Sequence, residues 1–479
     1  MNTAEANTAI ANRAWRFRRR RAAWTYRAYF VAGLVIIASL DHDSRLLAGP
    51  ILALAALSVY LVMTLWVRDG EVPLFETGTL FALAVSAYGM LALWGFLLMH
   101  GQWDPLSDNR LQWYSYDAGE LAALGWRCVV YLTAFVCVYL LVRGRVRAAR
   151  RLTPPSGSTV AAIVTLFVGL WILTLVLRFG YGFGTISYEN LDQVNAAMQA
   201  VPYIVRQLGH NIVSALLIAE QGILILLLLF WRRIASRVVV IAWLSGDVAL
   251  AFIHLGSRTG TVLLILSAAL VYHRLVRPLS FPVVLAGGGA LLMGFLFAGY
   301  IRSVSGEWNP RRLLTAANEF QAIFANAFDL LQRREQGTLP AVPWQIYAAD
   351  FYMPIPSQFL PFEKIEPASW YAGVLGAGNS GVGFMFGVMA QAAVGWDWVE
   401  LVLRGAALGV VFALLHRWYV RHSASLWPTL FYLFLGVCIY YTFRATSFWF
   451  VYFIVYQFLP VFIVAKILEL SLKRVLTRA

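Results

Sequence analysis

The stretch "HLGSRTG" (residues 254–260) places an imidazole, a hydroxyl and a guanidinium within five residues, inside a strongly apolar region. Arginine stays ionised and binds phosphate through paired hydrogen bonds, while histidine exchanges protons near neutral pH. Glycines at 256 and 260 favour a tight turn between two helices. The pattern predicts an anion-binding turn at Ser257 and Arg258. His254 is either a general base, an orienting group or a hydrogen-bonded structural histidine.

Other cationic side chains are expected at the same end of the molecule. Arg302 ends an apolar segment, with Arg311 and Arg312 soon after it, and Arg444 lies in the turn "FRATSF" (443–448). Several guanidinium groups at one level suit a multiply charged anion such as a lipid-linked pyrophosphate. The alternative for Arg302 and Arg444 is that each extends to lipid head groups.

The loop that follows Arg302 offers further side chains for substrate binding, namely Tyr352, Glu363 and Lys364. Tyr352 belongs to a set of aromatic residues that either stack on sugar rings or form a belt at the membrane interface. Glu307, Asp350 and Glu363 are further candidates for a general base, after His254.

The elements that position these residues are long apolar segments. The chain has 479 residues, of which 60% are hydrophobic and 13% charged, too apolar for the surface of a soluble domain. A helix of about 20 apolar residues crosses the hydrocarbon core of a bilayer. The sequence predicts an all-α polytopic membrane protein with about twelve transmembrane helices. They are expected at 26–41, 46–67, 76–99, 121–142, 158–178, 211–231, 237–255, 259–275, 281–301, 397–415, 426–443 and 446–469.

Basic linkers predict the orientation of these helices. The net charge of +14 is concentrated in short stretches between apolar segments, which is typical of cytoplasmic loops. Anionic lipid head groups are therefore the expected partners of these charges, and nucleic acid is not. Both termini are expected in the cytoplasm. The basic stretches are 16–21, 143–151, 232–237, 273–277, 416–422 and 473–478.

The predicted domain organisation follows from this orientation. It comprises a basic N-terminus (1–25), nine transmembrane helices (26–301), a large outer loop (302–396) that the resemblance described below makes periplasmic, three further helices (397–470) and a cytoplasmic tail (471–479). Residues 376–395 are apolar, but a full crossing would place basic linkers outside. We therefore expect a re-entrant or interfacial segment there. A helix around 320–331 is expected to pack on the bundle from the outer side.

Glu220 and Asp247 lie inside predicted transmembrane helices, where ionisable groups are often functional. The alternative is that each pairs with an arginine within the bundle.

Metal-binding and nucleotide-binding spacings are not found, so neither a metal ion nor another cofactor is predicted. The three cysteines fall in apolar segments and predict small core residues.

Several short motifs, in order, resemble the Wzy-type polymerases of oligosaccharide repeat units. They are "HLGSRTGTVLLIL", "GYIRS", "PIPSQFLPFEKIEP", "GNSGVGFMFGVMAQAAVGW" and "YYTFRATSF", all between residues 250 and 450. By position, Arg258, Arg302 and Arg444 match arginines of that family. The chain departs from the family at Gln391, where members often carry glutamate, and at residues 393–395.

The resemblance implies a metal-independent glycosyltransferase with a GT-C-like fold in the bacterial inner membrane, its active site facing the periplasm. The implied substrates are oligosaccharides linked to undecaprenyl pyrophosphate, and the implied partner is a chain-length regulator. An O-antigen ligase-like transferase would need the same anion site and is an alternative. A flippase or exporter of lipid-linked oligosaccharides is a second alternative, which would favour inverted repeats.

Overall fold

In the computed structural model, the structure describes residues 3–70, 73–98, 117–146, 149–181, 203–254, 258–303, 318–376 and 386–476. The secondary structure over these ranges is helical. Within them, 7 helices are long and apolar enough to cross a membrane. They are Phe17–Ser39, His42–Asp69, Thr77–Gly95, Ala118–Arg143, Gly157–Leu177, Trp398–His422 and Trp449–Arg474. The prediction of an all-helical protein is confirmed over the described residues, and the seven long apolar helices agree with a protein embedded in a membrane.

Shorter apolar helices cover much of what remains of the predicted bundle. They are Ala215–Leu229, Gly260–Leu275, Pro282–Gly294 and Leu426–Cys438. Each of the predicted transmembrane segments falls on one or more helices of the structure. The number of crossings and their direction stay predictions.

The chain divides into two compact units. Unit 1 comprises Met1–Ala149, Ala317–Val342 and Met385–Arg421, and unit 2 comprises Arg150–Ala316, Pro343–Phe384 and His422–Ala479. The stretch 302–396, predicted as one loop, is therefore shared between the two units.

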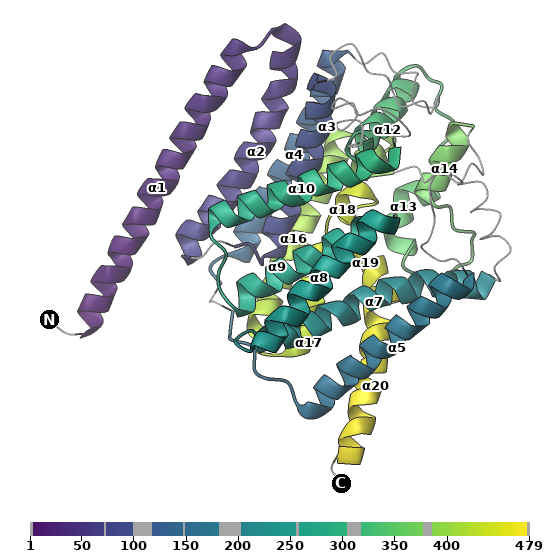
Figure 1. The fold of residues 1–479 in the computed structure, drawn as a ribbon. Coiled ribbons are helices and arrows are strands. Elements are labelled where there is room, and N and C mark those ends of the chain that lie inside the picture. The colour runs from purple at the N-terminus through teal and green to yellow at the C-terminus, as the bar shows by residue number, and fades with distance from the viewer. Residues whose placement is uncertain are drawn as a thin grey trace. The chain divides into compact units, whose positions relative to one another are not determined.

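Unit 1 is built on four consecutive helices, of which α2, α3 and α4 pack on one another and α1 packs on α2 (Figure 1). Its helices are α1 (Thr3–Ser39), α2 (His42–Asp69), α3 (Thr77–Leu98), α4 (Ala118–Arg143), α12 (Asn318–Glu335), α15 (Val388–Val394) and α16 (Trp398–His422). The rings of Phe81, Phe135 and Phe412 meet in its core, joining α3, α4 and α16.

α12 lies deeper in unit 1 than the sequence predicts. Its apolar face is buried as expected, including Phe324 and Ala327. Asn326 and Asp329 on other faces are buried too, because α12 packs against α3 on one side and α15 on another. α15 has 7 residues and is about 10 Å long, too short to cross a bilayer. The re-entrant path stays a prediction, because residues 377–385 lie outside the described residues.

Unit 2 contains the remaining helices. They are α5 (Gly157–Tyr181), α7 (Tyr203–Leu229), α8 (Ile234–His254), α9 (Arg258–Leu275), α10 (Phe281–Ser303), α13 (Trp344–Tyr352), η2 (Ser357–Phe359), α14 (Pro367–Val374), α17 (Leu426–Cys438), α18 (Tyr441–Arg444), α19 (Trp449–Phe453), η3 (Ile454–Phe458) and α20 (Leu459–Leu476). α5 packs along α7, and α7 along α9 (Figure 1). Buried Leu224, Val240 and Leu264 join α7, α8 and α9.

Candidate functional site

The basic linkers of unit 2 meet at one end of its helices. The Arg274 guanidinium donates to the carbonyl oxygen of Arg150, and the Arg150 amide donates to the hydroxyl of Ser423 at 2.8 Å. Thr159 donates to the Glu469 carboxylate at 2.7 Å. These contacts bring together the beginnings of α5 and α17 and the ends of α9 and α20.

The predicted arginine positions fall at the opposite end of unit 2. α9 begins at Arg258, about 24 Å along the helix from Arg274. α10 packs on α9, follows it after a short link and carries Arg302 in its last turn. α17 begins beside the end of α9, packs along it and leads to Arg444 in α18. The helix ends that bear Arg258 and Arg444 therefore lie at the same end, and the position of the end of α10 that bears Arg302 stays a prediction.

Several predicted site residues can be placed only in part. His254 is the last residue of α8, Arg258 the first of α9, and Arg302 lies in α10. Their side chains lie outside what the structure describes. Ser257, Arg311 and Arg312 fall wholly outside the described residues. The roles predicted for these residues stay predictions.

Arg444 lies directly after a predicted transmembrane helix that is interrupted in the structure. The segment expected at 426–443 ends as α17 at Cys438, and a turn leads into the single turn of α18. The Thr442 hydroxyl donates to the carbonyl oxygen of Ile439 at 2.6 Å, so the side chain satisfies part of the interrupted backbone. Thr442 and Ser447 are fully buried. Broken backbone is tolerated at membrane depth where protein surrounds it.

Aromatic rings surround this break. The Arg444 guanidinium carbon lies 5.9 Å from the centre of the Tyr441 ring. Beyond the break, the Trp449 and Tyr452 rings stack with centres 5.1 Å apart, and the Tyr456 ring follows at 4.6 Å from Tyr452. Residues 454–458 form a π-helical turn. Such turns occur often at functional sites, because an extra residue turns side chains out of α-helical register.

The loop containing residues 343–376 is attached to the same region. Asp350 is buried on α13, and its Oδ1 accepts a hydrogen bond of 2.9 Å from the backbone amide of Phe448. This contact fixes α13 beside the turn that follows Arg444. Asp350, predicted as a lesser candidate for a base, thus has a backbone partner that holds the loop.

The predicted substrate-binding residues of this loop have different surroundings. The Tyr352 hydroxyl donates to the carbonyl oxygen of Ile365 at 2.6 Å, and the Lys364 ammonium donates to that of Met353 at 2.9 Å. Burial raises the pKa of Tyr352 and lowers that of Lys364. Both hydrogen bonds join residues of the same loop and so stabilise its path. Glu363 is exposed.

Glu220 on α7 and Asp247 on α8 are close enough to interact electrostatically. Over the described residues, neither forms an ion pair with an arginine, and Asp247 Oδ2 is buried without a hydrogen-bond partner. The arginine pairing considered as an alternative is therefore not seen in this part of the chain. The neighbouring Gln221 instead donates to Ser267 on α9 at 2.9 Å.

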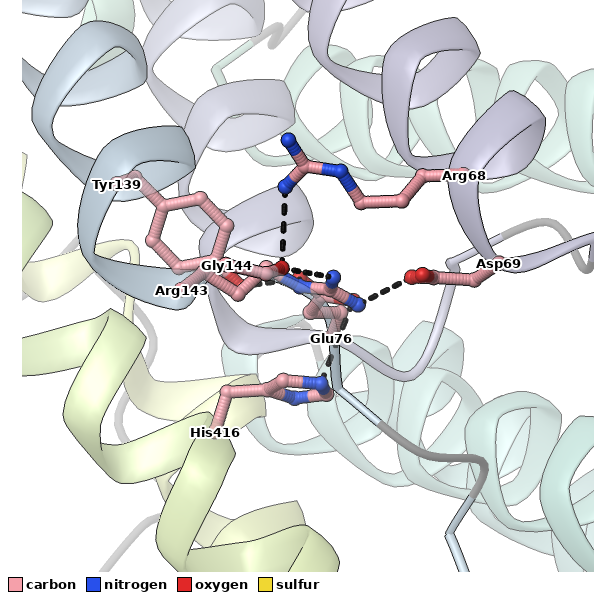
Figure 2. A network of polar contacts seen from close by, with 7 residues as sticks. All are labelled: Arg68, Asp69, Glu76, Tyr139, Arg143, Gly144 and His416. Carbon is pink, nitrogen blue, oxygen red and sulfur yellow. Dashed lines mark hydrogen bonds and ion pairs between the residues drawn. The ribbon is translucent and has the colours of Figure 1, made fainter.

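A buried polar network in unit 1, shown in Figure 2, was not predicted from the sequence. The Arg143 guanidinium binds Glu76 through Nε at 2.6 Å and through Nη2 at 2.9 Å, and it also contacts Asp69. The Tyr139 hydroxyl donates to Glu76, and His416 Nε2 lies 3.6 Å from the Glu76 carboxylate. This network, formed by Asp69, Glu76, Tyr139, Arg143 and His416, joins the ends of α2 and α4, the start of α3 and the last turns of α16.

Local sequence explains the tight fit of this network. A Cβ on Gly78 would lie 2.3 Å from the Tyr139 ring, so glycine lets the ring pass close to α3 and reach Glu76. A sequence signal existed, since Glu76 and Arg143 are charges at the limits of predicted transmembrane helices. Their pairing was not predictable, because residues 143 and 416 are far in the chain from residues 69 and 76.

Among the described residues, no group of three histidine, cysteine, aspartate or glutamate side chains is placed to hold a metal ion. Comparisons with protein-family models, with curated proteins and with solved structures return no match for this chain.

Proposed function

We propose that this chain is an integral-membrane glycosyltransferase that joins pyrophosphate-linked oligosaccharides into a polysaccharide. The observation that carries the proposal is Arg444 in α18, after the interruption at the end of α17, with stacked Trp449 and Tyr452 following it in the chain. Arg258 begins α9 and Arg302 lies in the last turn of α10, so an antiparallel course of these two helices would bring both arginines to the same end of unit 2. Arginines suit a pyrophosphate leaving group, and aromatic rings suit sugar faces. The resemblance of the motifs to Wzy-type polymerases supports the same reaction.

In the proposed reaction, a sugar hydroxyl of one lipid-linked repeat attacks the anomeric carbon of the growing chain. A glycosidic C–O bond forms as the bond to the pyrophosphate oxygen breaks, and the hydroxyl proton passes to a base. Negative charge develops on the departing lipid pyrophosphate, and fixed guanidinium groups stabilise it without a metal. We assign this task to Arg258, Arg302 and Arg444, and the proton to His254.

The proposed setting is the bacterial inner membrane, with the arginine end of unit 2 facing the periplasm. The substrates would be undecaprenyl-pyrophosphate-linked oligosaccharides, with a chain-length regulator as a protein partner. This orientation follows the positive-inside rule, because the basic linkers meet at the other end of unit 2.

Substitution of Arg444 tests the proposal. We expect Arg444→Ala to lower polymer formation at least 100-fold, because a charge stabiliser at the leaving group contributes about that factor. Arg444→Lys should restore little, since an ammonium cannot form the bidentate contact. The measurement is elongation of purified lipid-linked repeats by the protein in proteoliposomes.

Arg277→Ala is the matched control, because Arg277 is exposed and lies in the basic linker at the other end of α9. It should extend chains at the normal rate. Normal polymer from a well-inserted Arg444→Ala variant would overturn the proposed role of Arg444.

Loss of the whole protein separates the alternatives. A strain lacking a polymerase should make lipopolysaccharide that carries single repeat units. Full-length polymer that stays on its lipid carrier would instead indicate a ligase, and repeat units retained on the cytoplasmic side would indicate an exporter.

A further inference from the structure

α13 has one buried face and one exposed aromatic face. Ile346 and Ala349 are fully buried. On the other side, Trp344, Tyr347 and Phe351 are 54%, 42% and 77% exposed. At 100° per residue these three side chains fall within about 60° of the helix circumference. A short helix facing water would present polar residues on this face, so an apolar surrounding is required.

The exposed surface continues beyond α13. Ile355 is 39% exposed and Phe359, in η2, is 76% exposed. Together with Trp344, Tyr347 and Phe351 they form what we call the α13 aromatic face. Several large apolar side chains exposed along one short segment indicate contact with a membrane or another molecule.

The position of α13 identifies what covers this face. The Asp350 carboxylate holds α13 to the amide of Phe448, one residue before the apolar helix Trp449–Arg474. That helix has 26 residues and is about 39 Å long, which exceeds the roughly 30 Å of a hydrocarbon core. Its first residues therefore lie at a membrane–water interface, and α13 is fixed at the same level.

The residue types of the face match that environment. Tryptophan and tyrosine are enriched at membrane interfaces, because their rings are apolar and carry one polar group. Phe351, Ile355 and Phe359 carry no polar group and would satisfy none of the hydroxyls of a saccharide. Lipid fits this face better than a sugar chain does.

The geometry points to α13 as an interfacial anchor, with the α13 aromatic face in the boundary between lipid head groups and acyl chains. The anchor would hold the loop containing residues 343–376 at a fixed depth beside the helix break at Arg444. This inference needs no assumption about catalysis, and its test reads depth in the bilayer.

Site-specific fluorescence in the full chain tests the anchor. A Phe351→Cys variant, in a background without Cys128, Cys137 and Cys438, carries an environment-sensitive dye in phosphatidylcholine–phosphatidylglycerol vesicles. Lipids with a nitroxide at acyl carbon 5 should quench the dye at least twofold more than lipids with a nitroxide at carbon 12. Iodide in the water should quench it little.

Two control positions calibrate the depth. Ile172 on α5 is 52% exposed in the middle of an apolar helix, so a dye there should be quenched more by carbon-12 nitroxide. Gln336 is exposed in the turn after α12, and a dye there should be quenched by iodide. A dye at Phe359 gives a second reading outside α13, should the label at Phe351 disturb the helix.

Each other outcome overturns the anchor. Strong iodide quenching without lipid quenching at both positions would place the face in water. Protection from both quenchers would mean that protein covers it. In that case, the protein could be diluted into excess lipid. Loss of protection on dilution would mean that a second copy of the chain covers the face, and unchanged protection would mean that other residues of the same chain cover it.

Discussion

At the level of single residues, Arg143 is the centre of the network in Figure 2. It is 3% exposed and binds two carboxylates, Glu76 and Asp69. Removing water from an ion is costly, and partner charges offset that cost only while all of them are present. Removing one charged member should therefore lower the stability of the protein more than removing a paired acid and base together.

Substitution of Arg143 measures this sensitivity. We expect Arg143→Met to lower the free energy of unfolding by about 3–5 kcal/mol, because Glu76 is left buried without its cation. The double variant Glu76→Gln/Arg143→Met should recover part of the loss. The measurement is the midpoint of heat-induced loss of the monodisperse protein in detergent.

Arg417→Met is the control for this prediction. Arg417 is exposed and donates one hydrogen bond of 3.3 Å to the carbonyl oxygen of Val142, so its loss should cost less than about 1 kcal/mol. Equal midpoints for Arg143→Met and Arg417→Met would show that the buried network adds nothing to stability.

At the level of elements, α4 and α16 touch backbone to backbone. A Cβ added to Gly405 would lie 2.4 Å from the carbonyl oxygen of Tyr131, and one added to Gly409 would lie 2.8 Å from that of Phe135. Small residues four positions apart let membrane helices approach this closely. This contact carries His416 to the network at the end of α4.

A single methyl group tests the contact between α4 and α16. We expect Gly405→Ala to destabilise unit 1 by about 1–3 kcal/mol, because backbone atoms cannot yield as a flexible side chain would. Gly169→Ala on α5, where an added Cβ meets nothing within 4 Å, should be neutral or stabilising. If the thermal midpoints of Gly405→Ala and Gly169→Ala shift in the same direction by the same amount, close packing of α4 against α16 at Gly405 does not contribute to stability.

The elements differ in how far the sequence predicts them. Long apolar helices such as α2 and α4 follow from composition alone, because a helix lets a single segment satisfy all of its own backbone groups in lipid. The break at Ile439, beside which Thr442 and Ser447 are buried, and the π-helical turn at 454–458 do not follow from the apolar pattern. The buried setting of α12 depends likewise on α3 and α15, which are distant in sequence.

The candidate site rests on residue type and on helix direction, and the roles of its residues stay predictions. Basic linkers predicted that Arg258 and Arg444 belong to the same end, and contacts such as Arg274 with Arg150 agree within unit 2. The internal contacts of Tyr352 and Lys364 were not predictable, because their partners are carbonyl oxygens set by the loop path.

At the level of the whole molecule, sidedness is the property on which the proposed function depends. Cysteine labelling in intact cells measures it. We expect Ser369→Cys, exposed in α14, to react with a membrane-impermeant maleimide added outside, and Arg151→Cys, exposed before α5, to react only after permeabilisation. Cys137, the exposed native cysteine, is replaced in both variants.

The opposite labelling pattern would show that unit 2 has the orientation opposite to the one proposed. The end that carries Arg444 would then face the cytoplasm, and a periplasmic transferase would be ruled out. Reaction of both sites from outside would instead mean that the contact between Arg150 and Arg274 does not mark a cytoplasmic end.

The π-helical turn Ile454–Phe458 divides the last apolar helix into two parts that pack against different neighbours. One extra residue in a helix rotates everything after it by about 100° relative to everything before it. The aromatic ladder of Tyr452 and Tyr456 can thus be oriented for the region around Arg444 while α20 keeps its own contacts with α5. The side chains before the π-helical turn can therefore face the region around Arg444, while those after it face the partners of α20. Neither set of contacts restricts the rotation of the other part of the helix.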